Sequence, residues 1–143
     1  AVLSDILRSD FRSIGNNVTT TENSILDLSS TQFRFRGDID NNGTIDTVTY
    51  TLGSNIGGTA SIPNPNYRKL YRQVGTAASQ EVGQGASQVD VRLYDSVGAQ
   101  LSSPYNMSLV RSFSVKIVMQ EAKQINDVYP STTFEQHFFP PNL

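Results

Sequence analysis

Three aspartates crowded into one short polar segment are the residues whose types and spacing most clearly suggest chemistry. The segment Gly37–Asp46 reads Gly-Asp-Ile-Asp-Asn-Asn-Gly-Thr-Ile-Asp, and from its second residue onward it matches the start of a calcium-binding loop, D-x-[DN]-x-[DN]-G. Alternating oxygen ligands converge on one ion only where the chain curls around it, and Gly43 permits that curl. We therefore predict a calcium site. Its expected ligands are Asp38, Asp40, Asn42, the carbonyl oxygen of Thr44, and Asp46 directly or through water.

This ligand set is smaller than that of a standard helix–loop–helix calcium site. Calcium takes about 6–8 oxygen ligands, and Thr49 stands where such loops carry a bidentate glutamate. Strand-like patterns flank the loop, so we expect a weak site completed by water or by a residue elsewhere. A bare turn is the alternative, because Asn42-Gly43 between two alternating segments also favours a tight β-hairpin. The sequence leaves both interpretations open.

The single histidine, His137, is the other group that could carry chemistry. A hydrolase would need a nucleophile within reach of this ring and a carboxylate that orients it. The sequence contains no G-x-S-x-G or other nucleophile motif. We therefore expect a surface or edge position for His137 and no enzymatic activity.

Composition excludes several classes of function. The 143 residues are enough for one domain with a sizeable core, and a net charge of -2 argues against a nucleic-acid-binding surface. Without cysteine there is no disulfide framework and no thiolate metal site, and one histidine excludes a multi-histidine metal centre. Charged residues make up only 17%, and a surface made soluble by uncharged polar side chains is typical of an extracytoplasmic protein.

The elements that must position these residues begin with an amphipathic helix over Ala1–Ile14. Its apolar residues recur at helical spacing and form one stripe. The stripe consists of Leu3, Leu7, Phe11 and Ile14. Gly15 is a suitable end for the helix, since glycine tolerates a left-handed conformation. We predict that the stripe packs on the rest of the domain.

After residue 15 the hydrophobic period changes to two, which is typical of half-buried antiparallel strands. The alternating segments are Phe33–Arg36, Thr47–Leu52, Val89–Tyr94 and Ser112–Met119, with weaker candidates at Tyr67–Val74 and Thr132–Phe139. Two segments rich in glycine, Gly53–Asn66 and Gly75–Gly85, are expected to be irregular connections. One helix followed by about six strands predicts an α+β fold, with the N-terminal helix packed across one face of an antiparallel β-sheet.

The order of these features resembles the soluble part of type IV pilin-like proteins, specifically minor pilins and J-type minor pseudopilins of bacterial type IV pilus and type II secretion systems. Four segments carry the resemblance, namely a helix end, a strand–acidic loop–strand unit, a mid-sheet strand with its turn, and a penultimate strand. They are Asp5–Gly15, Phe33–Tyr50, Val89–Asp95 with Gly98, and Val110–Ile117. The family's N-terminal apolar helix and processing site are missing, so the chain would be a trimmed form. The region Gly53–Gly85 lacks a clear family pattern.

The resemblance implies a mechanical role and no catalysis. Residues 1–15 would be the end of a helical spine, and residues 16–143 a globular antiparallel sheet head, together forming one domain with a pilin-like fold. An apolar helix absent from this chain would anchor the full-length protein in the inner membrane, with the head in the periplasm or on a cell-surface filament. The implied partners are other pilin or pseudopilin subunits, often in a tip complex that starts assembly, and no nucleic acid.

The alternative function is a calcium-dependent carbohydrate-binding or adhesive module of a larger surface protein. Aromatic rings on the wet face of the sheet would favour sugar binding, but Tyr94 is the one ring expected there. Arg36-Gly37-Asp38 spells the integrin-binding tripeptide, yet its aspartate is also the first expected calcium ligand. The residues encoded before Ala1 discriminate between the two functions: about twenty apolar residues would support a pilin, and another globular domain would support a module.

Overall fold

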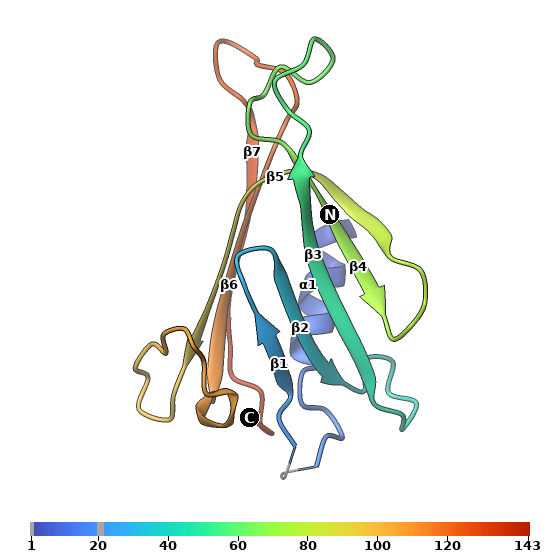
Figure 1. The fold of residues 1–143 in the computed structure, drawn as a ribbon, viewed down its shortest axis with the longest axis vertical. Coiled ribbons are helices and arrows are strands. Elements are labelled where there is room, and N and C mark those ends of the chain that lie inside the picture. The colour runs from blue at the N-terminus through green and yellow to red at the C-terminus, as the bar shows by residue number, and fades with distance from the viewer. Residues whose placement is uncertain (1, 20–21) are drawn as a thin grey trace.

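A seven-stranded antiparallel sheet forms most of the structure, a computed structural model that describes residues 2–19 and 22–143. The strands follow one another in space in the same order as in the chain (Figure 1). They are β1 (Ile25–Leu28), β2 (Gln32–Gly37), β3 (Asp46–Asn55), β4 (Arg68–Val74), β5 (Gln80–Tyr94), β6 (Ser112–Gln120) and β7 (Ser131–Phe138). The helices among the described residues are α1 (Val2–Arg12) and a short 3₁₀ turn, η1 (Met107–Leu109).

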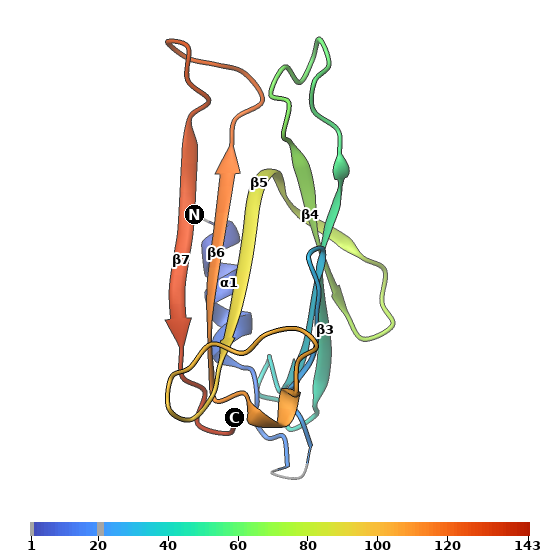
Figure 2. The ribbon, with the colours of Figure 1, turned by 60° about the vertical axis from the view of Figure 1, so that its left-hand side comes forward.

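The predicted α+β fold with a pilin-like head is wrong. Strands hold several times as many residues as helices do, so the fold is mostly β. The sheet curls into a half-barrel instead of lying beneath a helix that crosses one face (Figure 2). The helix α1 lies inside the curl, where it contacts residues of strands from both halves of the sheet. Alternating hydrophobicity specifies which side of a strand is buried, but it does not specify how far a sheet curls.

The long strand β5 is the element that divides and bends the sheet. Its first half pairs with β4 as far as Ala86, and its second half pairs with β6 from the same residue onward. Gly85, just before this junction, has φ +91, and a Cβ there would lie 2.1 Å from the carbonyl oxygen of Gln120. Only glycine fits such a position. The expectation of an irregular connection over Gly75–Gly85 is therefore wrong for residues 80–85, which form a bent strand.

The other predicted elements are found with shifted bounds. The helix ends at Arg12 instead of Ile14, and the predicted first residue, Ala1, lies outside the described residues. Strands β4 and β7 lie within one residue of their predicted ranges. Strand β1 was not predicted, because four residues are too few to show a clear period. None of the helices in residues 2–19 and 22–143 is long and apolar enough to cross a membrane.

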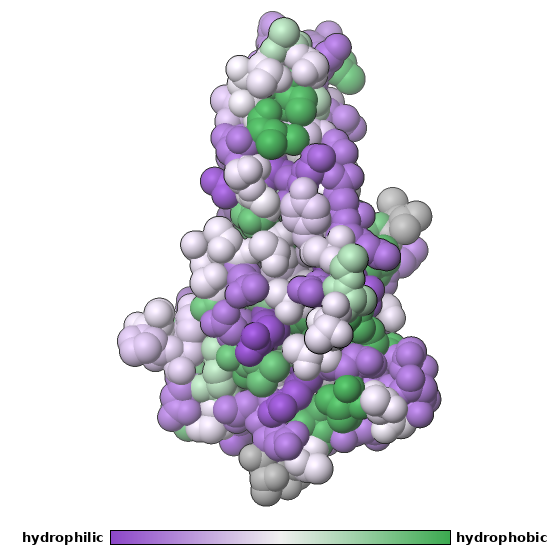
Figure 3. Space-filling model, turned by 45° about the vertical axis from the view of Figure 1, so that its right-hand side comes forward, coloured by the Kyte–Doolittle hydropathy of each residue, from purple (hydrophilic) through white to green (hydrophobic). Residues whose placement is uncertain are grey.

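Aromatic rings inside the curl form the centre of the core. Leu7, Phe11 and Ile14 are at most 2% exposed, so most of the helical stripe is buried, while Leu3 is only partly buried. The ring of Phe11 is the hub of this cluster. Its neighbours, at centroid distances of 5.5–6.1 Å, are Phe33, Phe35, Tyr50, Phe113 and Phe138. On the face seen in Figure 3, apolar side chains are limited to separate patches, in keeping with an apolar interior.

Candidate metal site and helix anchor

The acidic segment is the wide connection between β2 and β3. Gly37 at the end of β2 pairs with Asp46 at the start of β3, so residues 38–45 form the whole loop. A tight two-residue hairpin at Asn42-Gly43 is therefore wrong, since it would pair the residues directly on either side of that dipeptide. Positive φ angles at Asn41 (+60) and Gly43 (+87) curl the loop back on itself.

The curl brings together the three predicted carboxylate ligands. Asp38, Asp40 and Asp46 each offer an oxygen, and these oxygens lie within 4.8 Å of one another. Asp38 is buried, Asp40 is exposed and Asp46 is half-buried. One oxygen of Asp46, Oδ2, is shielded from solvent and has no hydrogen-bond partner among the described residues. A buried carboxylate oxygen without a partner is costly, and a cation would satisfy it.

Asp38 organises the loop through hydrogen bonds to its carboxylate. Its Oδ2 accepts from the backbone N–H of Gly43 at 2.7 Å and from the amide of Asn17 at 2.8 Å, and its Oδ1 accepts from the N–H of Asn42 at 3.0 Å. Burial alone raises the pKa of Asp38, but these hydrogen bonds outweigh burial and hold the pKa below its ordinary value. The carboxylate is thus kept in the charged form that a metal ligand requires.

Asn42, another predicted ligand, also makes hydrogen bonds within the loop. The side-chain amide of Asn42 donates to Asp40 at 3.1 Å, while its Oδ1 accepts from the backbone N–H of Thr44 at 2.8 Å. Asn42 therefore holds the loop closed and orients Asp40, and its oxygen already has a partner. Liganding by Asn42 and by the Thr44 carbonyl stays a prediction. The three carboxylates are the part of the predicted set that the structure brings together.

The loop is fastened to the end of the helix, a connection that sequence reasoning missed. The N–H of Asp38 donates to the carbonyl of Asn16 at 2.9 Å, and the amide of Asn16 donates back to the carbonyl of Asp38 at 2.9 Å. A Cβ on Gly37 would lie 2.0 Å from the carbonyl oxygen of Ser13, so the approach requires glycine. Asp38 is only 1% exposed, so the Arg36-Gly37-Asp38 tripeptide does not present its carboxylate to a receptor.

A second polar site anchors the middle of the helix to the sheet. Asp10 is 4% exposed and accepts two hydrogen bonds from Arg72 of β4, at 2.6 Å from Nε and 2.9 Å from a terminal nitrogen. The hydroxyl of Tyr50 on β3 donates to the same carboxylate. Paired, hydrogen-bonded charges of this kind are directional, so they fix how α1 sits against β3 and β4. Sequence reasoning missed this anchor, because the three residues are far apart in the chain.

The anchor shifts the acid–base behaviour of Tyr50. Burial, followed by the charge of Asp10 and the hydrogen bond to it, raises the pKa of the tyrosine well above its ordinary value, although Arg72 partly opposes this. The hydrogen bonds and negative charge of Asp10 likewise raise the pKa of Arg72. Both shifts favour the protonated forms that the anchor needs.

We expect the raised pKa of Tyr50 to make the fold sensitive to alkali. Above pH ~10 the unfolded chain loses the tyrosine proton while the folded chain keeps it, so stability present below that pH is lost as the pH rises. Urea unfolding between pH 8 and 11 should show a free energy of unfolding that falls more steeply in the wild type than in Tyr50→Phe, by about 1.4 kcal/mol per pH unit above pH ~10. Equal slopes in the two proteins would contradict this account.

His137 lies on the outer face of the sheet beside a buried serine. Its Nε2 is 3.0 Å from the hydroxyl of Ser112, which is only 5% exposed. In the described part of the chain, no carboxylate hydrogen-bonds to this imidazole. The ring stacks between Tyr94, at 4.9 Å, and Phe139, at 4.4 Å. A shielded serine is a poor nucleophile.

No protein-family model matches the chain, and comparisons with curated proteins and with solved structures found no match either.

Proposed function

We propose that this chain is the extracytoplasmic domain of a structural subunit of a bacterial type IV pilus or type II secretion pseudopilus, acting as a minor or tip subunit in assembly. The observation that carries the proposal is the way α1 is held. A helix that serves as the spine of a filament subunit must transmit load to its head. This requires a rigid connection between α1 and the sheet, which we call the joint.

Three sets of contacts along α1 support this proposal. Phe11 is enclosed by rings from both halves of the sheet, Asp10 is clamped to β3 and β4, and the residues after the helix are bonded to the acidic loop. Apolar packing resists separation, whereas the charged hydrogen bonds resist rotation of the helix about its axis. The curled sheet replaces the expected sheet head, but this joint does not depend on the head's fold class.

In this proposal the loop of Asp38, Asp40 and Asp46 binds one calcium ion that strengthens the joint. The ion would neutralise three carboxylates that otherwise repel one another and would satisfy the shielded Oδ2 of Asp46. Since Asp38 also bonds to Asn16 and Asn17, ordering the loop orders the helix end. The ion's role is stability and not chemistry. Asn42 and the Thr44 carbonyl stay predicted ligands, and water would complete the set, because the loop is exposed at Asp40.

Calcium is expected to raise the stability of the domain. With a dissociation constant of ~10⁻⁴–10⁻³ M, as in extracellular calcium modules, calcium at about ten times that value should add ~1.4 kcal/mol to the free energy of unfolding. Magnesium should add less, because it demands a smaller octahedral shell. The measurement is a thermal melt in calcium against chelator, joined with calorimetric titration.

Matched aspartate variants locate the effect. Asp40→Asn and Asp46→Asn should lose the calcium-dependent increment, and Asp5→Asn, on the exposed face of the helix, should keep it. Identical wild-type melting temperatures in both buffers, with no heat of binding at millimolar calcium, would show that the loop works without metal.

The filament role is tested in the cells that make the protein. The full-length protein should fractionate with the inner membrane and with filaments sheared from the surface, and deleting its gene should reduce filament number or protein secretion. The segment encoded before Ala1 should contain about twenty apolar residues with a glutamate near their start. A protein found only free in the medium, together with unchanged filaments and secretion in the deletion strain, would overturn the proposal.

A further inference from the structure

The second half of β5 has an edge without a neighbouring strand. Strand β4 pairs with β5 only as far as Ala86, whereas β6 pairs with β5 from Ala86 to Tyr94. Beyond Ala86, therefore, the edge of β5 that faces away from β6 is no longer paired with β4. A short segment after β5 covers the far end of this edge, where the N–H of Leu101 donates to the carbonyl of Leu93 at 2.8 Å.

That last contact shows which backbone groups point toward the open side. Successive residues of a strand direct their N–H and C=O groups to alternate sides. Because the carbonyl of Leu93 points away from β6, the backbone groups of Val91 and Val89 point the same way. Within residues 2–19 and 22–143, no backbone hydrogen bond is made on that side by Val89 or Val91. Two residues of a central strand thus present unpaired backbone N–H and C=O groups, as residues of an edge strand do.

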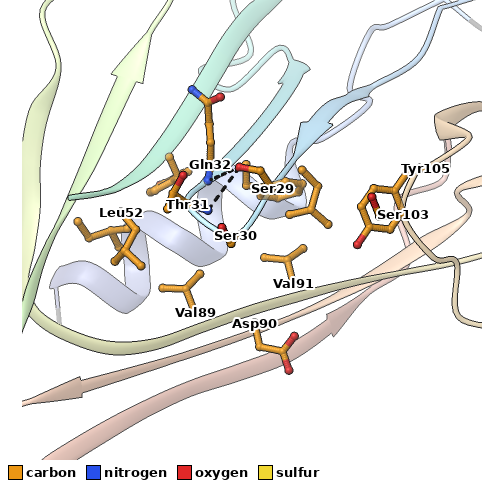
Figure 4. Close-up of a pocket in the computed structure, with 14 residues that line it drawn as sticks. Ser29, Ser30, Thr31, Gln32, Leu52, Val89, Asp90, Val91, Ser103 and Tyr105 are labelled. Carbon is orange, nitrogen blue, oxygen red and sulfur yellow. Dashed lines mark hydrogen bonds between the residues drawn. The ribbon is translucent and has the colours of Figure 1, made fainter. Parts of the chain in front are cut away.

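A groove lies along this edge (Figure 4). Its volume is about 300 Å³, and it separates β5 from the turn between β1 and β2. Its apolar lining comes from five strands. These residues are Leu28, Phe33, Leu52, Leu70, Val89 and Val91. The turn Ser29–Thr31 adds hydroxyl groups to the rim, and Asp90 is the one charged residue in the described lining.

We propose that this groove binds an extended segment of a neighbouring filament subunit, which adds a strand to the free edge of β5. An apolar groove alone would suit many ligands, but unpaired N–H and C=O groups beside it are satisfied by another backbone in β conformation. Apolar side chains at alternate positions of that segment enter the groove beside Val89 and Val91. The identity of the partner rests on the proposed function, whereas the strand-accepting edge does not.

Apart from Asp90, the lining of the groove is uncharged, which favours an uncharged segment. The side chain of Asp90 points away from Val89 and Val91 (Figure 4) and pairs with Arg92 at 3.1 Å. A charge on the segment would lose its hydration against the apolar lining, so apolar and uncharged polar side chains fit there best.

Amide hydrogen exchange of the isolated domain tests the free edge, with neighbouring residues of the same strand as internal controls. In the unliganded protein, Val89 and Val91 N–H should exchange faster than Asp90 and Arg92 N–H, which face β6, by about tenfold or more. A hexapeptide, acetyl-Lys-Val-Thr-Val-Thr-Val-amide, should then shift the Val89 and Val91 resonances saturably and slow their exchange by about tenfold or more. The same peptide with N-methylated central residues should do neither.

A pair of valine variants tests the apolar part of the groove. Val91→Thr keeps the shape and strand preference of the residue and should weaken binding of the hexapeptide by about tenfold. Val97→Thr, on a loop where the valine is 85% exposed, should leave binding unchanged.

Two results would overturn the inference: Val89 and Val91 amides as protected in the free protein as those of Asp90 and Arg92, or no localised response to millimolar hexapeptide. Either result would leave the cell fractionation test untouched. Conversely, the domain could bind the peptide while the full-length protein is absent from filaments. That result would support the groove inference and refute the filament role.

Discussion

Replacing Phe11 with alanine should lower the free energy of unfolding by about 3–5 kcal/mol, the range for deleting a fully buried ring. The side chain is 2% exposed, and its ring is surrounded by rings of β2, β3, β6 and β7. Its removal would leave a cavity where rings from both halves of the curled sheet meet the helix. Urea unfolding monitored by circular dichroism measures the loss directly.

Two further substitutions on the same helix separate burial from helix propensity. Arg12→Ala changes an exposed neighbour, and its free energy of unfolding should stay within about 0.5 kcal/mol of that of the wild type. Phe11→Leu retains most of the apolar contact and should fall between the two. A denaturation midpoint for Phe11→Ala equal to that of the wild type would refute the placement of this ring at the centre of the core.

Replacing Asp10 with alanine should also cost about 3 kcal/mol or more, because it leaves the partly buried charge of Arg72 without its partner. The side chain of Arg72 is 22% exposed, so solvent relieves part of that cost and places the effect at the low end of the range for buried pairs. The hydroxyl of Tyr50 loses its acceptor in the same variant. Thermal and urea unfolding at neutral pH are the measurements.

The matched control is Asp5→Ala. This aspartate lies on the same helix, is 78% exposed, and meets Arg8 at 3.7 Å, a geometry typical of a weak surface ion pair. Its loss should cost less than about 0.5 kcal/mol. A double-mutant cycle between Asp10 and Arg72 should give a coupling of about 1–3 kcal/mol. Coupling near zero would mean that the anchor does not hold the helix.

Both predictions concern the joint between helix and sheet, on which the proposed function depends. If α1 transmits load, a subunit with either change should fold less stably as an isolated domain and should also be recovered in smaller amount from sheared filaments. The stability measurements stand without the filament proposal, so they distinguish a wrong fold from a wrong function.

Local patterns in the sequence determined the elements that depend on local physics. The apolar stripe of Leu7, Phe11 and Ile14 specified a helix and its buried side, because residues three and four apart share a helical face. Alternation specified strands and their inner faces for the same kind of reason, as at Phe33 and Phe35, both buried. The acidic loop could also be read directly, since a glycine at a sharp turn and regularly spaced carboxylates are neighbours in the chain.

Only the tertiary structure decided how these elements are combined. The curl depends on Gly85 meeting the backbone of Gln120 across the sheet, and nothing in a glycine-rich segment distinguishes a bent strand from a loop. The anchor needs Asp10, Tyr50 and Arg72 at one point, although they belong to three different elements. The open edge at Val89 and Val91 exists because β4 stops pairing where β5 bends. Each of these features is a contact between distant parts of the chain, and hydrophobic periodicity records only whether a side chain is buried, not which residue it meets.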